Sequence, residues 1–321
     1  MSDRTRGAVT ALRAACVSRR ALIAAVIMAA TVSGCARAQL SGKAAAPALA
    51  RADTAALHRI LDSIADAHHG IVGYAIHNLE TGERLERRGD ETFPTASLIK
   101  VPILVTVYDL VAKGQLALTD PLTVLRIDQV GGAGVLQHMR PGLTISVADA
   151  AWLMATISDN TATNLLVDRI AARRVWQKME ALGLPHSKVH GRSMNAIARV
   201  SVDSAEKYGL GVTTPNEMAA LFELLARGKA VNAQADSAML DVLEHNEDSD
   251  LLQRFAGGVR AAHKTGATDR VRTECTLWYL SSRVVACVLT RENVDTRWVL
   301  DNEAQLTMGR MGEAIVRAWT R

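Results

Sequence analysis

The chain has 321 residues, of which 49% are hydrophobic and 4% aromatic. This length and apolar share suffice for a substantial core without extra cross-links, and so few aromatic residues argue against a surface that stacks bases or sugars. Five of the 37 basic residues and one of the 33 acidic residues fall within residues 1–34, so the rest of the chain carries 32 of each. The formal net charge of +4 belongs to this leader, and we expect no nucleic-acid partner.

The N-terminus has the pattern of an export signal. The dipeptide Arg19-Arg20 precedes an apolar run over residues 21–32 that is too short to cross a bilayer comfortably, and small residues follow it. The sequence V-S-G-C ending at Cys35 resembles a bacterial lipobox, in which the cysteine is lipidated and becomes the new N-terminus. We expect a signal peptide over 1–34 and a periplasmic lipoprotein anchored through Cys35. An ordinary signal peptide is the alternative.

An alanine-rich stretch over 36–52 is typical of a tether, and structured elements follow it. We expect a helix from Asp53, a favourable N-cap residue, to about His68, with its apolar residues on one face. Two strands, 71–78 and 84–88, are expected next.

The middle of the chain, from Ser97 to about Asn246, is mostly helical in pattern. Segments with helical spacing of apolar residues are 98–112, 147–157, 162–171, 175–182 and 215–227. Residues 183–214 are the exception, and an irregular stretch of that length inside a compact domain is usually functional.

The end of the chain returns to strand patterns rich in β-branched and aromatic residues. The expected strands are 260–264, 273–280 and 283–290, and the expected final helix is 302–319. Strands at both ends around a helical middle predict one α/β (α+β) catalytic domain over 53–321. It has a five-stranded antiparallel sheet from both termini, flanked by helices, with an inserted all-helical lobe at about 97–246. A cleft between sheet and lobe is the expected place for a site.

Two cysteines, Cys275 and Cys287, flank the turn-like sequence Ser281-Ser282-Arg283. They can face each other on paired strands and form a disulfide in an oxidising compartment. Two buried thiols are the alternative, and the sequence leaves both open.

Three short motifs carry the candidate chemistry, and the first is S-x-x-K from Ser97 to Lys100. A helical turn puts both residues on one face. A serine hydroxyl needs an adjacent base to act as a nucleophile, and a neutral lysine amine can be that base. The ordinary lysine pKa of about 10.4 must therefore be lowered strongly, as burial and a second cation would do. The second motif is S-D-N: Ser158 can relay a proton to a leaving nitrogen, and the Asn160 amide can hold a substrate carbonyl.

The third motif, K-T-G, lies on a predicted strand. Lys264 supplies the second cation and can bind a substrate carboxylate, and Gly266 allows close backbone approach. The backbone N–H groups of Ser97 and Ala267 would form an oxyanion hole. One such motif alone is weak, but three in this order are specific.

Together, S-x-x-K, S-D-N and K-T-G make the sequence similar to class A β-lactamases, within the penicillin-recognising serine hydrolases. The intervals of 61 residues from Ser97 to Ser158 and 106 from Ser158 to Lys264, and the later sequence Thr-Thr-Pro at 213–215, also resemble class A. The resemblance covers about 53–321. It implies a monomeric hydrolase that opens a β-lactam through an acyl-enzyme at Ser97, with no metal and no cofactor. The residues to which it assigns catalytic or substrate-binding roles are Ser97, Lys100, Ser158, Asn160, Lys264, Thr265 and Ala267.

One departure from class A concerns the glutamate that activates the water releasing the acyl group. Its position in the long loop falls near 192–195, where the sequence Arg-Ser-Met-Asn has no carboxylate. Glu206 is the candidate deacylation base, with Asp203 beside it, if either folds back into the cleft. The alternative is that both face solvent. Arg270 or Arg272 is the candidate for an arginine that binds the substrate carboxylate.

Three functions remain open: a β-lactamase, a D,D-peptidase-type cell-wall hydrolase acting on D-Ala-D-Ala ends, and a penicillin-binding protein that acylates with little turnover. The class A intervals favour the first, and the missing loop glutamate favours the other two. His138 and His190 are interpreted as satisfied structural residues. No histidine or cysteine cluster has metal-ligand spacing, so we expect no metal site.

Overall fold

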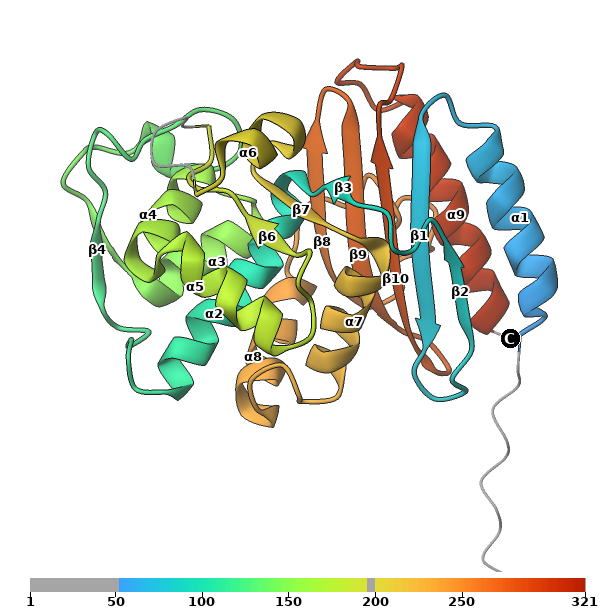
Figure 1. The fold of residues 1–321 in the computed structure, drawn as a ribbon, viewed down its shortest axis with the longest axis horizontal. Coiled ribbons are helices and arrows are strands. Elements are labelled where there is room, and N and C mark those ends of the chain that lie inside the picture. The colour runs from blue at the N-terminus through green and yellow to red at the C-terminus, as the bar shows by residue number, and fades with distance from the viewer. Residues whose placement is uncertain (1–51, 195–199, 321) are drawn as a thin grey trace, which may run out of the picture. The chain divides into compact units, whose positions relative to one another are not determined.

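A five-stranded antiparallel sheet organises residues 52–194 and 200–320, the part of the chain described by the computed structural model (Figure 1). The strand order is β2-β1-β10-β9-β8. The strands are β1 (Ile71–Asn78), β2 (Arg84–Arg87), β8 (Ala261–Thr268), β9 (Val271–Tyr279) and β10 (Arg283–Arg291). Because β1 and β2 come from one end of the sequence and β8 to β10 from the other, the predicted fold is confirmed.

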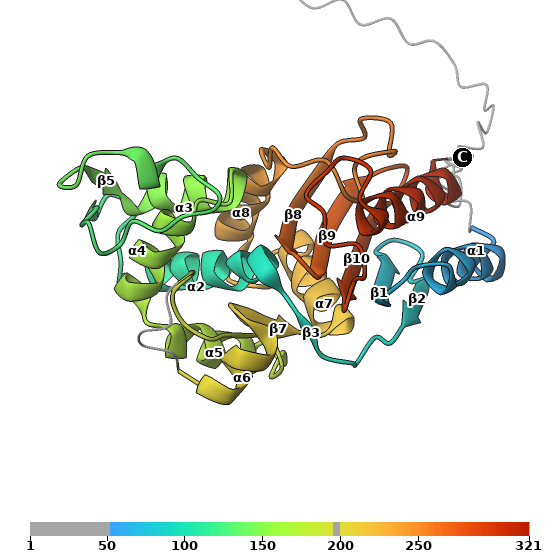
Figure 2. The same cartoon turned by 90° about the horizontal axis from the view of Figure 1, so that it is seen from above.

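Helices cover both faces of this sheet. On one face, Tyr74 and Ile76 of β1 pack against α1 (Thr54–Asp66) and α9 (Glu303–Trp319), which lie side by side (Figure 2). On the other face, Val285 of β10 packs in the cluster that includes residues of α7 (Pro215–Ala226). Since side chains alternate along a strand and both faces are covered, the central strands are nearly continuous apolar runs.

The helical lobe is built around α2, which is apolar on all sides and buried over most of its length. Helices α3, α4, α5 and α8 pack against it. The bounds are α2 (Lys100–Ala112), α3 (Val147–Thr156), α4 (Asn160–Ile170), α5 (Ala172–Ala181) and α8 (Ala233–Glu244). The 3₁₀ turn η1 (Ala96–Ile99) runs directly into α2 and contacts β8, so Ser97 lies where lobe and sheet meet.

Short elements fill the connections. They are β3 (Phe93–Pro94), β4 (Pro121–Thr123), the 3₁₀ turn η2 (Leu136–His138), β5 (Thr144–Ser146), β6 (Lys188–Val189), α6 (Val202–Tyr208) and β7 (Gly211–Thr213). The stretch 183–214, predicted as irregular, therefore contains β6, α6 and β7. These elements have two to seven residues, too few for a hydrophobic period to show. Helix α8 was not predicted. The predicted strand 260–264 ended before Thr265, whereas β8 continues to Thr268.

Cys275 and Cys287 form a disulfide between β9 and β10, which decides between the two states that the sequence left open. The two residues are directly paired in the register. The same register row continues to Ala75 on β1 and to Lys264 on β8. The disulfide therefore neighbours a predicted site residue.

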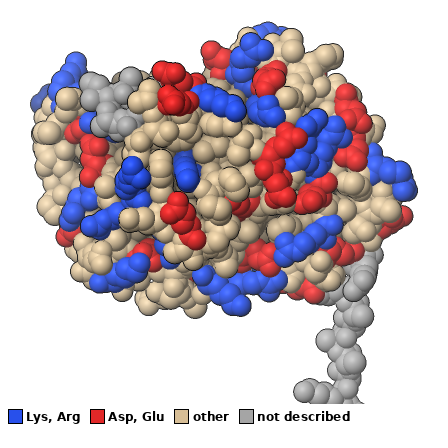
Figure 3. All heavy atoms as spheres, viewed as in Figure 1, with Lys and Arg blue, Asp and Glu red and all other residues tan. Residues whose placement is uncertain are grey.

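The predicted signal peptide, Cys35 and all but the last residue of the predicted tether lie outside the described residues. Across residues 52–194 and 200–320, no helix has the length and hydrophobicity needed to cross a membrane. Basic and acidic side chains are intermixed on the face shown in Figure 3.

Candidate active site

A cavity of about 550 Å³ lies between η1, β8 and the segment 190–210. Three predicted site residues, Ser97, Asn160 and Ala267, line it. The residues that line it from segment 190–210 are His190, Gly191, Arg192, Ser193, Met194, Ala205, Lys207, Tyr208, Gly209 and Leu210. Lys100, Ser158, Lys264 and Thr265 lie in or directly beside a hydrogen-bond network that includes Asn160.

The backbone is strained at two positions of the site, directly before Ser97 and at Ser158 itself. Ala96, just before Ser97, has φ 46°, and Ser158 has φ 59°. Such left-handed conformations cost about 1–3 kcal/mol each in non-glycine residues and cluster at active sites. Leu98 and Ile99 of η1 are buried in the hydrophobic core, and this packing fixes the turn that carries Ser97.

Strand β8 approaches η1 so closely that only glycine fits at position 266. A Cβ on Gly266 would lie 2.5 Å from the Thr95 carbonyl oxygen and 2.7 Å from the Ser97 nitrogen. The Ser97 amide therefore lies beside the backbone of Gly266, one residue before Ala267. The two amides predicted to form the oxyanion hole come from these two adjacent segments.

Lys100 is fully buried and bonded to the S-D-N motif. Its Nζ lies within hydrogen-bond distance of three oxygens: the Ser158 carbonyl at 2.7 Å, Ser158 Oγ at 3.0 Å and Asn160 Oδ1 at 3.0 Å. The Asn160 amide nitrogen donates in turn to the Gly131 carbonyl at 3.1 Å. Lys264, also fully buried, donates to Ser158 Oγ at 3.2 Å and to the Thr265 carbonyl at 2.8 Å. Ser158 Oγ thus accepts from both lysines, and its own proton remains available to a third partner.

Burial and mutual repulsion set the charge states of the two lysines. Burial, together with the charge of Lys264, lowers the pKa of Lys100 well below its usual value, and the Asp159 carboxylate opposes this shift. Burial lowers the pKa of Lys264 to about 8, opposed by Asp248 and Glu274. With a pKa of about 8, Lys264 is mostly charged at pH 7. Burial and the charge of Lys264 both favour the neutral form of Lys100, the form that can accept a proton.

The middle residue of S-D-N has a structural role. Asp159 caps α4 by accepting from the Ala162 amide at 2.9 Å, and its other oxygen accepts from the amides of Val135 and Leu136 at 2.7 and 2.9 Å. This buried carboxylate fixes the start of the helix that carries Asn160 and the loop beside it.

Thr265 is 3% exposed, and its hydroxyl has a partner. Thr265 Oγ1 donates to Asp248 Oδ2 at 2.7 Å. Sequence reasoning did not select Asp248, because nothing in the local pattern around it indicates this contact with β8.

The opposite wall is held by an asparagine of α4. Asn164 Oδ1 accepts from the Ser193 amide at 2.6 Å, and its Nδ2 donates to the Ser193 carbonyl at 3.3 Å. Ser193 is 5% exposed and lines the cavity, within the stretch 192–195 near which the resemblance to class A enzymes predicts the loop carboxylate. The neighbouring Arg192 is paired with Asp128 at 2.7 Å.

Glu206, the candidate deacylation base, lies on the exposed face of α6, as does Asp203. Neither lines the cavity; α6 turns Ala205, Lys207 and Tyr208 toward it instead. Among the described residues that line the cavity, none is a carboxylate. Of the two alternatives left by the sequence, this structure has the one in which both carboxylates face solvent, because the helical period of α6 turns them outward.

His190, interpreted from sequence as a satisfied structural residue, lines the cavity and is 2% exposed. Its Nδ1 donates to the Gly209 carbonyl at 2.8 Å, and its Nε2 lies 2.8 Å from Ser204 Oγ. These bonds attach His190 to Ser204 within α6 and to Gly209 directly after it.

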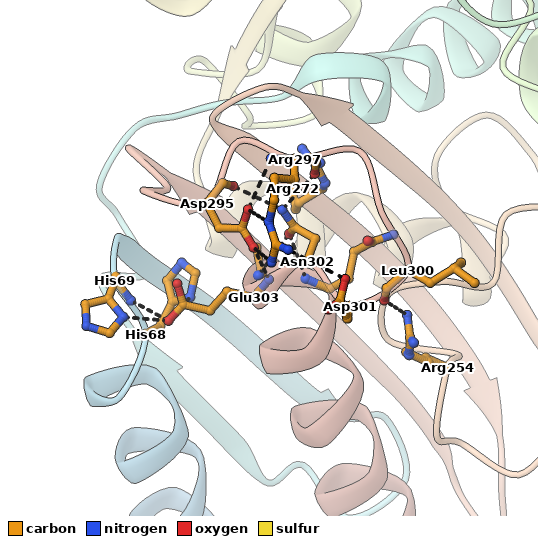
Figure 4. A network of polar contacts seen from close by, with 12 residues as sticks. His68, His69, Arg254, Arg272, Asp295, Arg297, Leu300, Asp301, Asn302 and Glu303 are labelled. Carbon is orange, nitrogen blue, oxygen red and sulfur yellow. Dashed lines mark hydrogen bonds and ion pairs between the residues drawn. The ribbon is translucent and has the colours of Figure 1, made fainter.

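The two candidate arginines are not among the residues that line the Ser97 cavity. Arg272 is 2% exposed, donates to the carbonyls of Thr268 and Val271, and lies 4.6 Å from the Trp298 ring. Figure 4 shows its guanidinium beside Arg297, in the polar network of the β10–α9 connection. Arg270 is exposed and lines a smaller neighbouring pocket. No group of three or more histidine, cysteine, aspartate or glutamate side chains suited to a metal gathers within residues 52–194 and 200–320.

The architecture and the cavity together are those of a serine β-lactamase-like hydrolase. A family model described as the Beta-lactamase enzyme family matches residues 56–319, and the chain belongs to this family. The β-lactamase of Rhodobacter capsulatus is 23% identical over 285 residues, which cover 85% of this chain and 92% of that protein.

Solved structures agree with this assignment. The β-lactamase of Sphaerobacter thermophilus superposes with a TM-score of 0.73 and 27% identity, covering 83% of this chain and 97% of its own. PBP-A superposes with a TM-score of 0.73 and 26% identity, covering 84% of this chain and 97% of its own. The chain therefore resembles both β-lactamases and PBP-A over nearly the whole of its described part.

Proposed function

We propose that the protein opens β-lactams by forming an acyl-enzyme at Ser97 and hydrolyses this ester slowly. The observation that carries the proposal is the Lys100–Ser158–Lys264 network beside Ser97. Ser97 Oγ attacks the lactam carbonyl while its proton passes to neutral Lys100. The developing oxyanion is held by the amides of Ser97 and Ala267.

Collapse of this intermediate breaks the carbonyl–nitrogen bond. Ser158 gives its proton to the leaving nitrogen and regains one from Lys100, whose Nζ lies 3.0 Å away. Protons therefore balance, and the acyl group remains as an ester on Ser97. Asn160 binds the substrate carbonyl in this scheme, and Lys264 and Thr265 form the edge of the site where class A enzymes hold the substrate carboxylate.

The second half of the reaction needs a water and a base. The described cavity wall offers no carboxylate, so we propose that hydrolysis of the ester limits turnover. General-base help is typically worth about 10²–10⁴-fold. A mutant of PBP-A has been solved as an acyl-enzyme complex with penicillin G, and the likeness supports a penicillin-binding protein with little turnover as the second candidate. A D,D-peptidase activity would use the same nucleophile.

Intact-protein mass spectrometry over time with benzylpenicillin tests the proposal. We expect one acyl mass per chain, on the peptide containing Ser97, which decays slowly. A persistent adduct favours the second candidate, and rapid turnover without accumulation contradicts slow hydrolysis. An adduct that survives Ser97→Ala rejects the nucleophile.

We also propose that the mature protein is a monomeric lipoprotein outside the cytoplasm, anchored through Cys35. The support is the leader pattern in the sequence. In a bacterial host, the product should be found in the membrane fraction, and globomycin should block its processing. A soluble periplasmic product cut at another site would reject the anchor.

A further inference from the structure

A carboxylate of the protein already occupies the edge where the substrate carboxylate is expected. Asp248 lies in the connection between α8 and β8, and this connection is tied to the end of α3. The side-chain amide of Asn246 donates to the Ala155 carbonyl at 2.9 Å, and the backbone amide of Glu247 donates to the Thr156 carbonyl at 3.1 Å. These two bonds fix the residues just before Asp248 against the end of α3, and Asp248 itself contacts Thr265 of β8.

Both carboxylate oxygens of Asp248 accept hydrogen bonds. Oδ1 accepts from the Asp250 amide at 3.2 Å, and Oδ2 accepts from Thr265 Oγ1 at 2.7 Å. The Thr265 hydroxyl proton is therefore directed at Asp248. Asp248 itself is exposed, so an incoming ligand can reach it.

Its charge also acts on the cation of this edge. Asp248 is the largest influence raising the pKa of Lys264, against the lowering effect of burial. Part of the positive potential of Lys264 is thus already balanced within the protein. A substrate carboxylate placed against Lys264 and Thr265 would meet a like charge and compete for one hydroxyl proton.

We infer that Asp248 is a specificity-determining residue that disfavours a carboxylate at the Lys264–Thr265 subsite. The favoured substrates are then acyl donors whose group at this position is uncharged or cationic, such as esters and amides. This inference rests on the proposed acylation at Ser97.

The test compares acylation of the full chain by benzylpenicillin and by its methyl ester, which differ in this one charge. The wild type should acylate faster with the ester. Asp248→Asn keeps an oxygen that can accept from Thr265 but removes the charge, and it should raise the apparent second-order acylation constant for the acid about tenfold. The effect on the acid should appear as a lower concentration of benzylpenicillin at half-saturation. The acylation constant for the methyl ester should stay within about twofold of wild type.

Matched variants separate charge from structure. Glu247→Gln removes the neighbouring exposed carboxylate and should leave the acid-to-ester ratio unchanged, whereas Asp248→Glu should keep the preference for the ester. Equal changes for acid and ester in Asp248→Asn would reduce Asp248 to a structural role and overturn the inference. A wild-type preference for the acid would overturn it without any variant. Absence of an adduct with both compounds would instead reject the proposed function.

Discussion

The two walls of the Ser97 cavity are built in different ways. The wall from η1, the start of α4 and β8 holds two fully buried lysines, and hydrogen bonds join them to Ser158. The wall from segment 190–210 includes Met194, which is 74% exposed, and the seven-residue α6. On this wall, Asn164 bonds Ser193 at both its amide and its carbonyl.

This contrast separates the two half-reactions. Formation of the ester depends on preorganised groups of the first wall, where burial lowers the pKa of Lys100. Hydrolysis of the ester depends on a base that the described residues of the second wall do not supply as a carboxylate. Substitutions on one wall should therefore change one half-reaction and spare the other.

The largest effect is expected from placing a carboxylate on the second wall. Ser193→Glu puts a carboxylate at a position that lines the cavity and whose backbone is already fixed by Asn164. We expect deacylation to rise by about 10²–10⁴-fold, with the burst of β-lactam opening replaced by steady turnover. Stopped-flow hydrolysis and the decay of the adduct mass measure both steps.

Ser193→Gln is the control, because it has the same size and no basic carboxylate. It should deacylate no faster than wild type. If Ser193→Glu folds and acylates but its adduct is as long-lived as that of wild type, the second wall does not limit turnover.

The next effect concerns the first wall. Gly266→Ala would put a methyl group 2.5 Å from the Thr95 carbonyl and 2.7 Å from the Ser97 nitrogen, so β8 and η1 must move apart. A displacement of about 1 Å at a reacting group costs about 10²-fold in rate. We expect acylation by the folded protein to fall by that factor and the melting temperature to fall as well, because the added methyl group separates β8 from η1. Acylation at the wild-type rate would show that the close approach is dispensable.

The first wall was also the part of the site that the sequence predicts best. Lys100 must follow Ser97 by one helical turn, and position 266 must lack a Cβ, so chemistry fixes residue type and spacing there. Likewise, the strands of the sheet are long and apolar enough to be recognised. By contrast, β6, α6 and β7 are too short for a period, and their placement depends on the tertiary structure.

The second wall could not be predicted, because long-range contacts position it. Asn164 and Ser193, whose contact positions this wall, are 29 residues apart in sequence. On the first wall, the contact between Asp248 and Thr265 was missed for the same reason, because these residues are 17 apart. No local sequence pattern predicts either contact. The orientation of Glu206 was open for the same reason. The sequence did not show whether it faces the cleft or solvent, and the burial of Ala205 leaves Glu206 on the exposed face of α6.

A smaller effect should appear in the pH profile of acylation. The charge of Lys264 lowers the pKa of Lys100, and acylation requires neutral Lys100, so the rate rises as the pH passes this pKa. Lys264→Ala removes the repulsion, raises the pKa of Lys100 and should move the acid limb to higher pH. Lys264→Arg keeps a cation and should restore the limb toward the wild-type position. An acid limb unchanged in Lys264→Ala would contradict the electrostatic coupling.

The smallest effect is expected at the two exposed carboxylates of the second wall. Glu206→Gln and Asp203→Asn change side chains that do not line the cavity, so both half-reactions should stay within about twofold of wild type, as for ordinary surface substitutions. Single-turnover acylation and adduct decay at pH 7 measure each step for each variant. A collapse of deacylation in either one, with acylation intact, would show that α6 rearranges after acylation and brings that carboxylate to the ester. The ester would then be hydrolysed by a group from the second wall after all, and the gain expected for Ser193→Glu should shrink accordingly.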